Sequence, residues 1–235
     1  MKQFLLGLFL LLSINIFPQG EQKDKTFFSE ALFMHLPEYN QKADLAYRYK
    51  NYEKGEELFK NLVQKNLQGT YMDNFKFHQL NKKEVNLYDF KKPVFLITYA
   101  SWCLPSKGEI PALNQLADQY KNKVDFVVLY WDTRDQAKEM AKDFNEHISV
   151  VYVDETKNRG AYVVKQLKHS LGLPTCFLMS GDKQIMNIRR SVFPPLDTDE
   201  ELAYRENYKA IEASIAENLI RNYEDDYVEN IILVD

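Results

Sequence analysis

The chain has 235 residues, of which 45% are hydrophobic and 14% aromatic, so it is long enough to bury one well-packed core with additions. Residues 21–196 carry a net charge of only +4, which excludes the basic footprint of a nucleic-acid-binding protein. Residues 197–235 differ, with twelve Asp or Glu against three Lys or Arg. We therefore expect an acidic C-terminal segment attached to a nearly neutral body.

Residues 1–20 have the features of a signal peptide. Lys2 supplies the positive end, and the apolar core from Phe4 to Phe17 is short for a membrane span. Pro18-Gln19-Gly20 is a poor cleavage site, so an uncleaved N-terminal membrane anchor is the alternative. In both cases the rest of the chain is expected to be exported, to the periplasm or beyond the cell.

The first half of the chain is predicted to hold a helical segment and then a two-stranded ribbon. Residues 26–66 have helically spaced apolar positions, and Pro37 is expected to break the stretch. Residues 75–79 and 84–88 alternate in polarity around Asn81-Lys82-Lys83, which predicts a β-ribbon.

The middle of the chain alternates between strands and helices. Continuous apolar runs at residues 94–99 and 126–130 are typical of central strands covered on both faces. Between them, residues 106–120 are expected to form a helix that Pro111 kinks. Thr133 with Gln136 forms a capping box for a helix reaching Phe144.

The remaining elements complete an α/β pattern with a mixed central sheet and helices on both faces. The alternation implies parallel pairing, and a turn at Gly181-Asp182 makes the last strand pair antiparallel. After a joint at Pro194-Pro195, the stripe Tyr204, Tyr208, Ile211, Ile215 and Leu219 predicts an amphipathic helix docked on the body with its acidic residues outward. The other expected elements are strand 149–153, helix 160–168, strand 175–179 and strand 184–190.

Cys103 follows the buried strand at residues 94–99, where the next helix is expected to begin. A sulfur at a helix N-terminus has its thiolate stabilised and its pKa lowered. A dithiol redox site would carry a second cysteine three residues on, but Ser106 occupies that position. The sequence thus keeps a candidate nucleophile without a resolving thiol beside it.

Three segments in order resemble the thioredoxin-like proteins of the exported TlpA/ResA type, and this resemblance implies a thioredoxin fold over residues 73–193. It leaves residues 21–72 as a helical N-terminal segment and residues 194–235 as a C-terminal acidic helix. By resemblance, Cys103 is the attacking cysteine, Ser106 replaces the resolving one, Glu109 is the acidic residue of the active-site helix, and Pro174 is a cis-proline facing the thiol. Trp102, Leu173 and Thr175 would contact the substrate. The matching segments are Asp73–Leu80 with Glu84–Phe90, Trp102–Pro111 and Gly172–Leu178.

A lone thiolate can form a mixed disulfide, which an external or client thiol must then release. Ser106 could donate a hydrogen bond to the thiolate, and Glu109 could be either a buried carboxylate with a raised pKa or an ordinary exposed one. Cys176 is expected to be a small hydrophobic residue packed in a buried strand. A disulfide between Cys176 and Cys103 is the disfavoured alternative. A peroxiredoxin is also disfavoured, because Ala100 stands where that chemistry needs a hydroxyl.

Two functions follow from the sequence. The first is a monothiol, isomerase-like thiol-disulfide exchange protein acting on client proteins with disulfides or thiols, with an external reducing thiol as a further partner. The second is a catalytically silent binding module that holds envelope client proteins in a groove around Trp102 and Pro174. The four histidines lack ligand spacing, so neither a metal nor a cofactor is expected.

Overall fold

The computed structural model describes residues 25–157, 161–191, 195 and 197–232, with side chains described up to Leu219. The predicted signal peptide and Pro194 of the predicted joint lie outside these ranges. The strands are β1 (Lys76–Gln79), β2 (Glu84–Asn86), β3 (Val94–Tyr99), β4 (Asp125–Tyr130), β5 (Ile148–Tyr152), β6 (Thr175–Met179) and β7 (Ile185–Arg190). The helices are α1 (Phe28–Arg48), α2 (Tyr52–Leu62), α3 (Glu109–Tyr120), α4 (Arg134–Met140), α5 (Ala161–Val163) and α6 (Glu200–Ile232).

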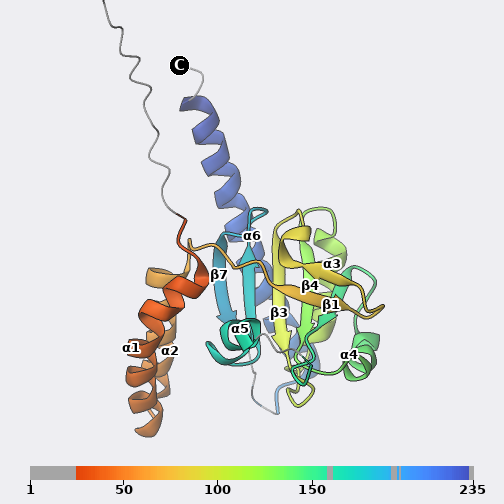
Figure 1. Ribbon diagram of the computed structural model, residues 1–235, viewed down its shortest axis with the longest axis horizontal. Helices are drawn as coiled ribbons and strands as arrows, with labels where there is room; N and C mark the ends of the chain where they lie inside the picture. Colours follow the sequence, from red (N-terminus) through yellow and green to blue (C-terminus); the bar gives the residue numbers. More distant parts are fainter. Residues whose placement is uncertain (1–24, 158–160, 192–194, 196, 233–235) are drawn as a thin grey trace, which may run out of the picture.

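The seven strands form one mixed sheet in the order β2-β1-β5-β4-β3-β6-β7 (Figure 1). The three central strands β3, β4 and β5 are parallel, as the strand-helix alternation predicts. β6 pairs antiparallel with β3, and β7 pairs antiparallel with β6. Every residue of β3 and β6 is buried, so both faces of the sheet are covered there.

The local signals of turns and caps are confirmed in several places. β1 and β2 form the predicted antiparallel ribbon, with Lys82 at positive φ in the turn. Thr133 caps α4, and its hydroxyl lies 2.8 Å from the Gln136 side-chain oxygen. The helix predicted over residues 160–168 is α5 followed by a π-helical turn at Val164–His169, although Gly160 lies outside the described residues.

The N-terminal helices α1 and α2 form a hairpin beside the β7 edge of the sheet (Figure 1). Arg190 of β7 holds the helical hairpin against the sheet. Its guanidinium lies 4.2 Å from the centre of the Phe59 ring, and it donates hydrogen bonds to the hydroxyls of Tyr39 and Tyr47, each at 3.1 Å. The prediction that Pro37 breaks this stretch is wrong, because α1 runs through it. Phe33 and Pro37 are both exposed, so water can bind the carbonyl that the missing N–H leaves free.

The C-terminal helix α6 packs against α3 and then runs beyond the edge of the sheet (Figure 1). The predicted stripe is partly buried: Ile211 and Ile215 are fully enclosed, whereas Tyr204 and Tyr208 are half-buried. The centre of the buried face is therefore rotated toward Ala203 and Asn207. Among the helices that the structure describes, none is both long enough and apolar enough to cross a membrane.

Candidate functional site

Cys103 lies in the loop after β3, at the end of the sheet where the carboxyl ends of the parallel strands β3 and β4 lie. The backbone N–H of Cys103 donates to the Ala100 carbonyl at 2.8 Å and closes a tight turn. Asp132, just beyond β4, accepts from both the backbone N–H and the hydroxyl of Ser101, at 2.6 and 2.7 Å. The parallel pairing brings this carboxylate to the cysteine loop, and its two hydrogen bonds fix the start of that loop.

The prediction that Cys103 sits at a helix N-terminus is wrong, because α3 begins only at Glu109. Two residues keep the helix from starting earlier. Pro105 disfavours a helical conformation at the residue before it, and Gly108 has φ +78°, which a right-handed helix cannot contain. Pro111 is consequently the third residue of α3. The first N–H groups of a helix have no acceptor within the helix, so a proline at this position removes no helical hydrogen bond and the reason for expecting a kink does not apply.

The thiol of Cys103 is nearly enclosed between two exposed neighbours. Cys103 is 7% exposed, whereas Trp102 is 69% and Leu104 83% exposed. Burial raises the pKa of Cys103 above its ordinary value, and the negative charge of Asp132 raises it further. A hydrogen bond with the Ala100 backbone and the positive charge of Lys168 act in the opposite direction. The lowered pKa expected from a helix dipole is therefore not found, and the resting thiol is protonated at neutral pH.

Glu109 and Ser106 are joined by a reciprocal pair of hydrogen bonds. The Ser106 N–H donates to Oε2 of Glu109 at 3.1 Å, and the Glu109 N–H donates to the Ser106 carbonyl at 3.0 Å. Glu109 is completely buried, so the exposed alternative for this residue is excluded. The Ser106 hydroxyl does not serve the thiol as expected, because it donates to Oδ1 of Asn207 in α6 at 3.2 Å.

Two tyrosines lie beneath this loop at the carboxyl ends of β3 and β4. The rings of Tyr99 and Tyr130 stack with centroids 5.8 Å apart. Their hydroxyls and Oε1 of Glu109 are buried and have no hydrogen-bond partner among the described residues. Burial raises the pKa of Tyr99 well above its ordinary value, and the adjacent Glu109 carboxylate adds to the effect. Burial raises the pKa of Tyr130 as well, so both phenols stay neutral at neutral pH.

Pro174 lies at the same end of the sheet as Cys103, because Thr175 at the start of β6 pairs with Thr98 near the end of β3. The Leu173-Pro174 peptide bond is cis, as the resemblance implies. Leu173 is half-buried and Pro174 buried. Thr175 is enclosed in the sheet, where its hydroxyl donates to the Gly172 carbonyl at 2.8 Å. Of the three predicted contact residues, Trp102 is the one with a largely exposed side chain.

Cys176 is a core residue of β6, as its position in an apolar run predicts. It is 1% exposed, and both cysteines are free thiols. Burial raises the pKa of Cys176 to about 11, with Arg189 on the paired strand acting against this. This thiol is therefore inert in the folded protein at neutral pH.

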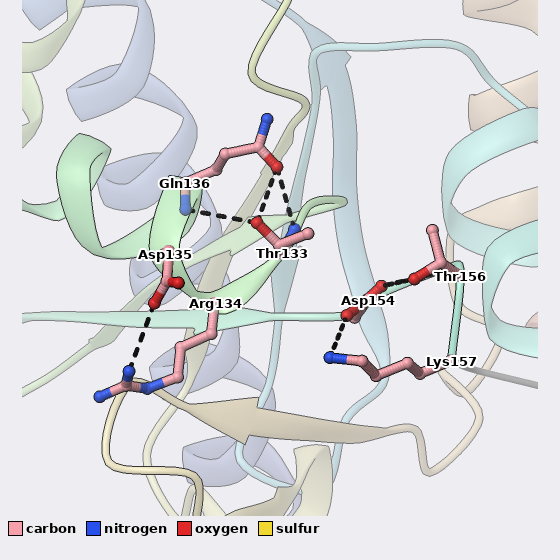
Figure 2. A network of polar contacts seen from close by, with 7 residues as sticks. All are labelled: Thr133, Arg134, Asp135, Gln136, Asp154, Thr156 and Lys157. Atoms are coloured by element: carbon pink, nitrogen blue, oxygen red, sulfur yellow. Dashed lines mark hydrogen bonds and ion pairs between the residues drawn. The ribbon is translucent and has the colours of Figure 1, made fainter.

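A groove of about 670 Å³ lies between the β1–β2 ribbon and the end of β5. Arg134, which lines it, donates from Nε to the Leu80 carbonyl at 2.6 Å. Asp154 on its other wall accepts from Thr156 at 2.6 Å and pairs with Lys157 at 3.1 Å, as Figure 2 shows. Lys76 and Glu84, which also line the groove, form a second ion pair at 3.1 Å. Within the ranges that the structure describes, no three His, Cys, Asp or Glu side chains gather into a metal site.

Two residues of this region were not predicted from the sequence, Asp132 and Asn207. Asp132 had a signal, because it follows a buried parallel strand directly and such strand ends meet at one edge. Asn207 had a weaker one: it is a polar residue on the same helical face as Ala203 and Ile211, all three fully buried. Contact between Asn207 and Ser106 joins positions 101 apart in the chain, which spacing alone does not reveal.

A family model described as the AhpC/TSA family matches residues 69–188 of this chain. The thiol-disulfide oxidoreductase ResA of Bacillus thuringiensis subsp. konkukian is 32% identical over 121 residues, which are 50% of this chain and 66% of that protein. The thioredoxin-like protein YneN of Bacillus subtilis is 21% identical over 139 residues, 57% of this chain and 78% of that one. A putative thiol:disulfide interchange protein DsbE from Chlorobium tepidum superposes with a TM-score of 0.49 at 22% identity, covering 65% of this chain and 97% of that one.

Proposed function

Because this chain belongs to the AhpC/TSA family of thioredoxin-like proteins, we propose that it is a thiol-disulfide exchange protein with Cys103 as its single nucleophile. The observation that carries the proposal is the position of this thiol at the carboxyl end of β3, opposite the start of β6. The exposed side chains of Trp102 and Leu104 flank it and offer apolar contacts to a client. The name of the ResA relative supports the same chemistry.

The exchange proceeds in two displacement steps. The Cys103 thiol loses its proton, and the thiolate attacks one sulfur of a client disulfide. A new S–S bond forms, the client S–S bond breaks, and the departing client sulfur takes up a proton. A second thiolate, from the same client or an external reductant, then attacks the mixed disulfide, and Cys103 leaves as a thiolate. Cys176 is too deeply buried to take that second role.

We place this activity outside the cytoplasm, in the periplasm or a secreted fraction, on the strength of the apolar N-terminal segment with Lys2. The alternative is that this segment is not cleaved and anchors the protein in the membrane, with the rest of the chain still outside the cytoplasm. The partners would be proteins with disulfides or thiols, together with an external thiol that releases the mixed disulfide. We propose the corresponding division of the chain into a helical N-terminal segment at 21–72, a thioredoxin-like domain at 73–193 and a C-terminal helix packed on that domain at 194–235.

One observation favours a second function, a binding module without turnover. The thiol is protonated at rest because burial raises its pKa, whereas exchange enzymes gain from a lowered one. In addition, the hydroxyl at the resolving position is bound to Asn207. A protein that only held clients against Trp102 and Leu104 would need no reactive sulfur.

The test is to trap the mixed disulfide. The Cys176→Ala protein is incubated with a disulfide-linked peptide and analysed by intact mass under non-reducing conditions, with Cys103→Ser in the same background as the control. The exchange function predicts one peptide adduct per chain that dithiothreitol removes, and none in the control. Peptide binding without an adduct would favour the binding module instead.

A further inference from the structure

The loop that follows Cys103 is pressed directly onto the backbone of the C-terminal helix α6. A Cβ atom on Gly108 would lie 2.4 Å from the Tyr204 nitrogen and 2.5 Å from the Tyr204 Cα. These are backbone atoms, which cannot swing aside as a flexible side chain can. Only glycine allows this approach, so the loop and the first turns of α6 are in main-chain contact.

Asn207 fixes this contact from the helix side. Its amide oxygen accepts from the Ser106 hydroxyl at 3.2 Å, and its amide nitrogen donates to the Lys107 carbonyl at 3.0 Å and to the Ala203 carbonyl at 3.1 Å. The residue is fully buried. A buried amide is costly unless it is hydrogen-bonded, so the two bonds to Ser106 and Lys107 specify one docked position of the loop, while the bond to Ala203 lies within α6.

The loop is consequently held at both of its ends. On the side of β3, Ser101 is bound to Asp132 and the Cys103 N–H to Ala100. On the side of α3, Ser106 is held by Asn207. Lys107 adds a bond from its ammonium group to the Thr198 carbonyl at 2.7 Å. Between these fixed points the chain has little freedom to lift the sulfur of Cys103 out of its enclosed position.

We propose that Asn207 is a positioning residue for the cysteine loop: through Ser106 and Lys107 it keeps the thiol of Cys103 enclosed in the free protein. In this account, Ser106 is an anchor for α6 as well as the replacement for a second cysteine. The inference deepens the proposed exchange function, because it assigns α6 the control of how readily the nucleophile meets solvent and clients. It does not require exchange to occur, since it concerns only the exposure of the sulfur.

The experiment measures the alkylation rate of Cys103 by iodoacetamide across a pH series, in the Cys176→Ala background. Asn207→Ala removes all three bonds, and Ser106→Ala removes only the hydroxyl bond. Asn218→Ala is the matched control: Asn218 is also buried on α6 and donates to the carbonyl four residues earlier, at 2.7 Å from Ser214, without touching the loop. The charged groups that influence the thiol, Asp132 and Lys168, are unchanged in every variant.

Asn207→Ala should raise the rate at pH 7 about three- to tenfold and move the midpoint of the pH profile downward, because a freed loop exposes the sulfur and relieves the burial that raises its pKa. Ser106→Ala should give a smaller rise in the same direction. The double variant should react no faster than Asn207→Ala alone, since both changes remove one shared bond. Asn218→Ala should keep the parental rate and midpoint.

Equal rates and midpoints in Asn207→Ala and the parent would overturn the proposal. So would an equal rise in Asn218→Ala, which would mean general loosening of the helix rather than release of the loop. If Asn207→Ala does not fold, Ser106→Ala carries the test against the same control. A missing peptide adduct with an intact Asn207 effect would refute exchange alone, so the two proposals fail separately.

Discussion

Replacing Gly108 by alanine should disturb the docking of α6 on the cysteine loop. The new Cβ would meet the Tyr204 nitrogen at 2.4 Å and the carbonyl carbon of Ala203 at 2.9 Å. Separations under 3.0 Å are not tolerated, and the opposing atoms belong to helix backbone. The first turns of α6 must therefore move away from the loop.

The size of the effect can be separated into two parts with a matched glycine. Gly108 has φ +78°, and an alanine there costs about 1–2 kcal/mol of conformational strain. Gly69 has a similar φ of +86° and nothing within 4 Å of its Cβ position, so Gly69→Ala carries the strain alone. Overpacking typically adds about 1–3 kcal/mol. Gly108→Ala should thus lower the free energy of unfolding by about 2–5 kcal/mol, and Gly69→Ala by about 1–2 kcal/mol.

Urea unfolding of the two variants, followed by circular dichroism, gives both free energies. The alkylation rate of Cys103 should rise in Gly108→Ala and stay at the parental value in Gly69→Ala. Equal losses of stability in the two variants would refute the close packing of the loop on α6. A large loss in Gly108→Ala without any change in the reactivity of Cys103 would refute the link between that packing and the thiol.

Two further predictions concern the core and a helix cap. Burial raises the pKa of Cys176 to about 11, so folding favours its neutral thiol, and this contribution to stability is complete below about pH 8.5 and declines as the pH rises toward 11. The Cys176→Ala protein should lose less stability than the parent between pH 8.5 and 11 in urea unfolding; identical slopes would contradict the deep burial of this thiol. Thr133→Ala should cost about 1 kcal/mol through loss of the α4 cap, whereas Thr133→Ser should retain most of that energy, and equal costs in both would show that the hydroxyl does not cap the helix.

The sheet was predictable because its signals are local. The runs at 94–99 and 126–130 are apolar apart from Thr98, as is typical of central strands, and both form fully or almost fully buried parallel strands. The capping box at Thr133 and the turn at Asn81-Lys82-Lys83 likewise depend on a few neighbouring residues. Such patterns do not need the rest of the fold.

The environment of Cys103 was harder to predict, because it depends on competing local signals and on a distant contact. Ser106 to Tyr120 has helical spacing, but Gly108 adopts a left-handed conformation that delays the helix to Glu109. Gly108 combines this left-handed conformation with a close approach to the backbone of Tyr204, which is nearly a hundred residues away in the sequence. A pKa argument based on a helix start at Cys103 therefore had the wrong sign, because burial decides the outcome.

The central claim, that one enclosed thiol carries out the exchange, is tested most directly by the pH dependence of a single rate. In the Cys176→Ala protein, the second-order rate of mixed-disulfide formation with a small peptide disulfide is measured by intact mass. We expect one adduct, on Cys103, and a rate that rises with pH to a midpoint above the ordinary range of a cysteine thiol, because burial raises its pKa. No adduct at any pH at which the protein stays folded, or a midpoint below that range, would contradict the account.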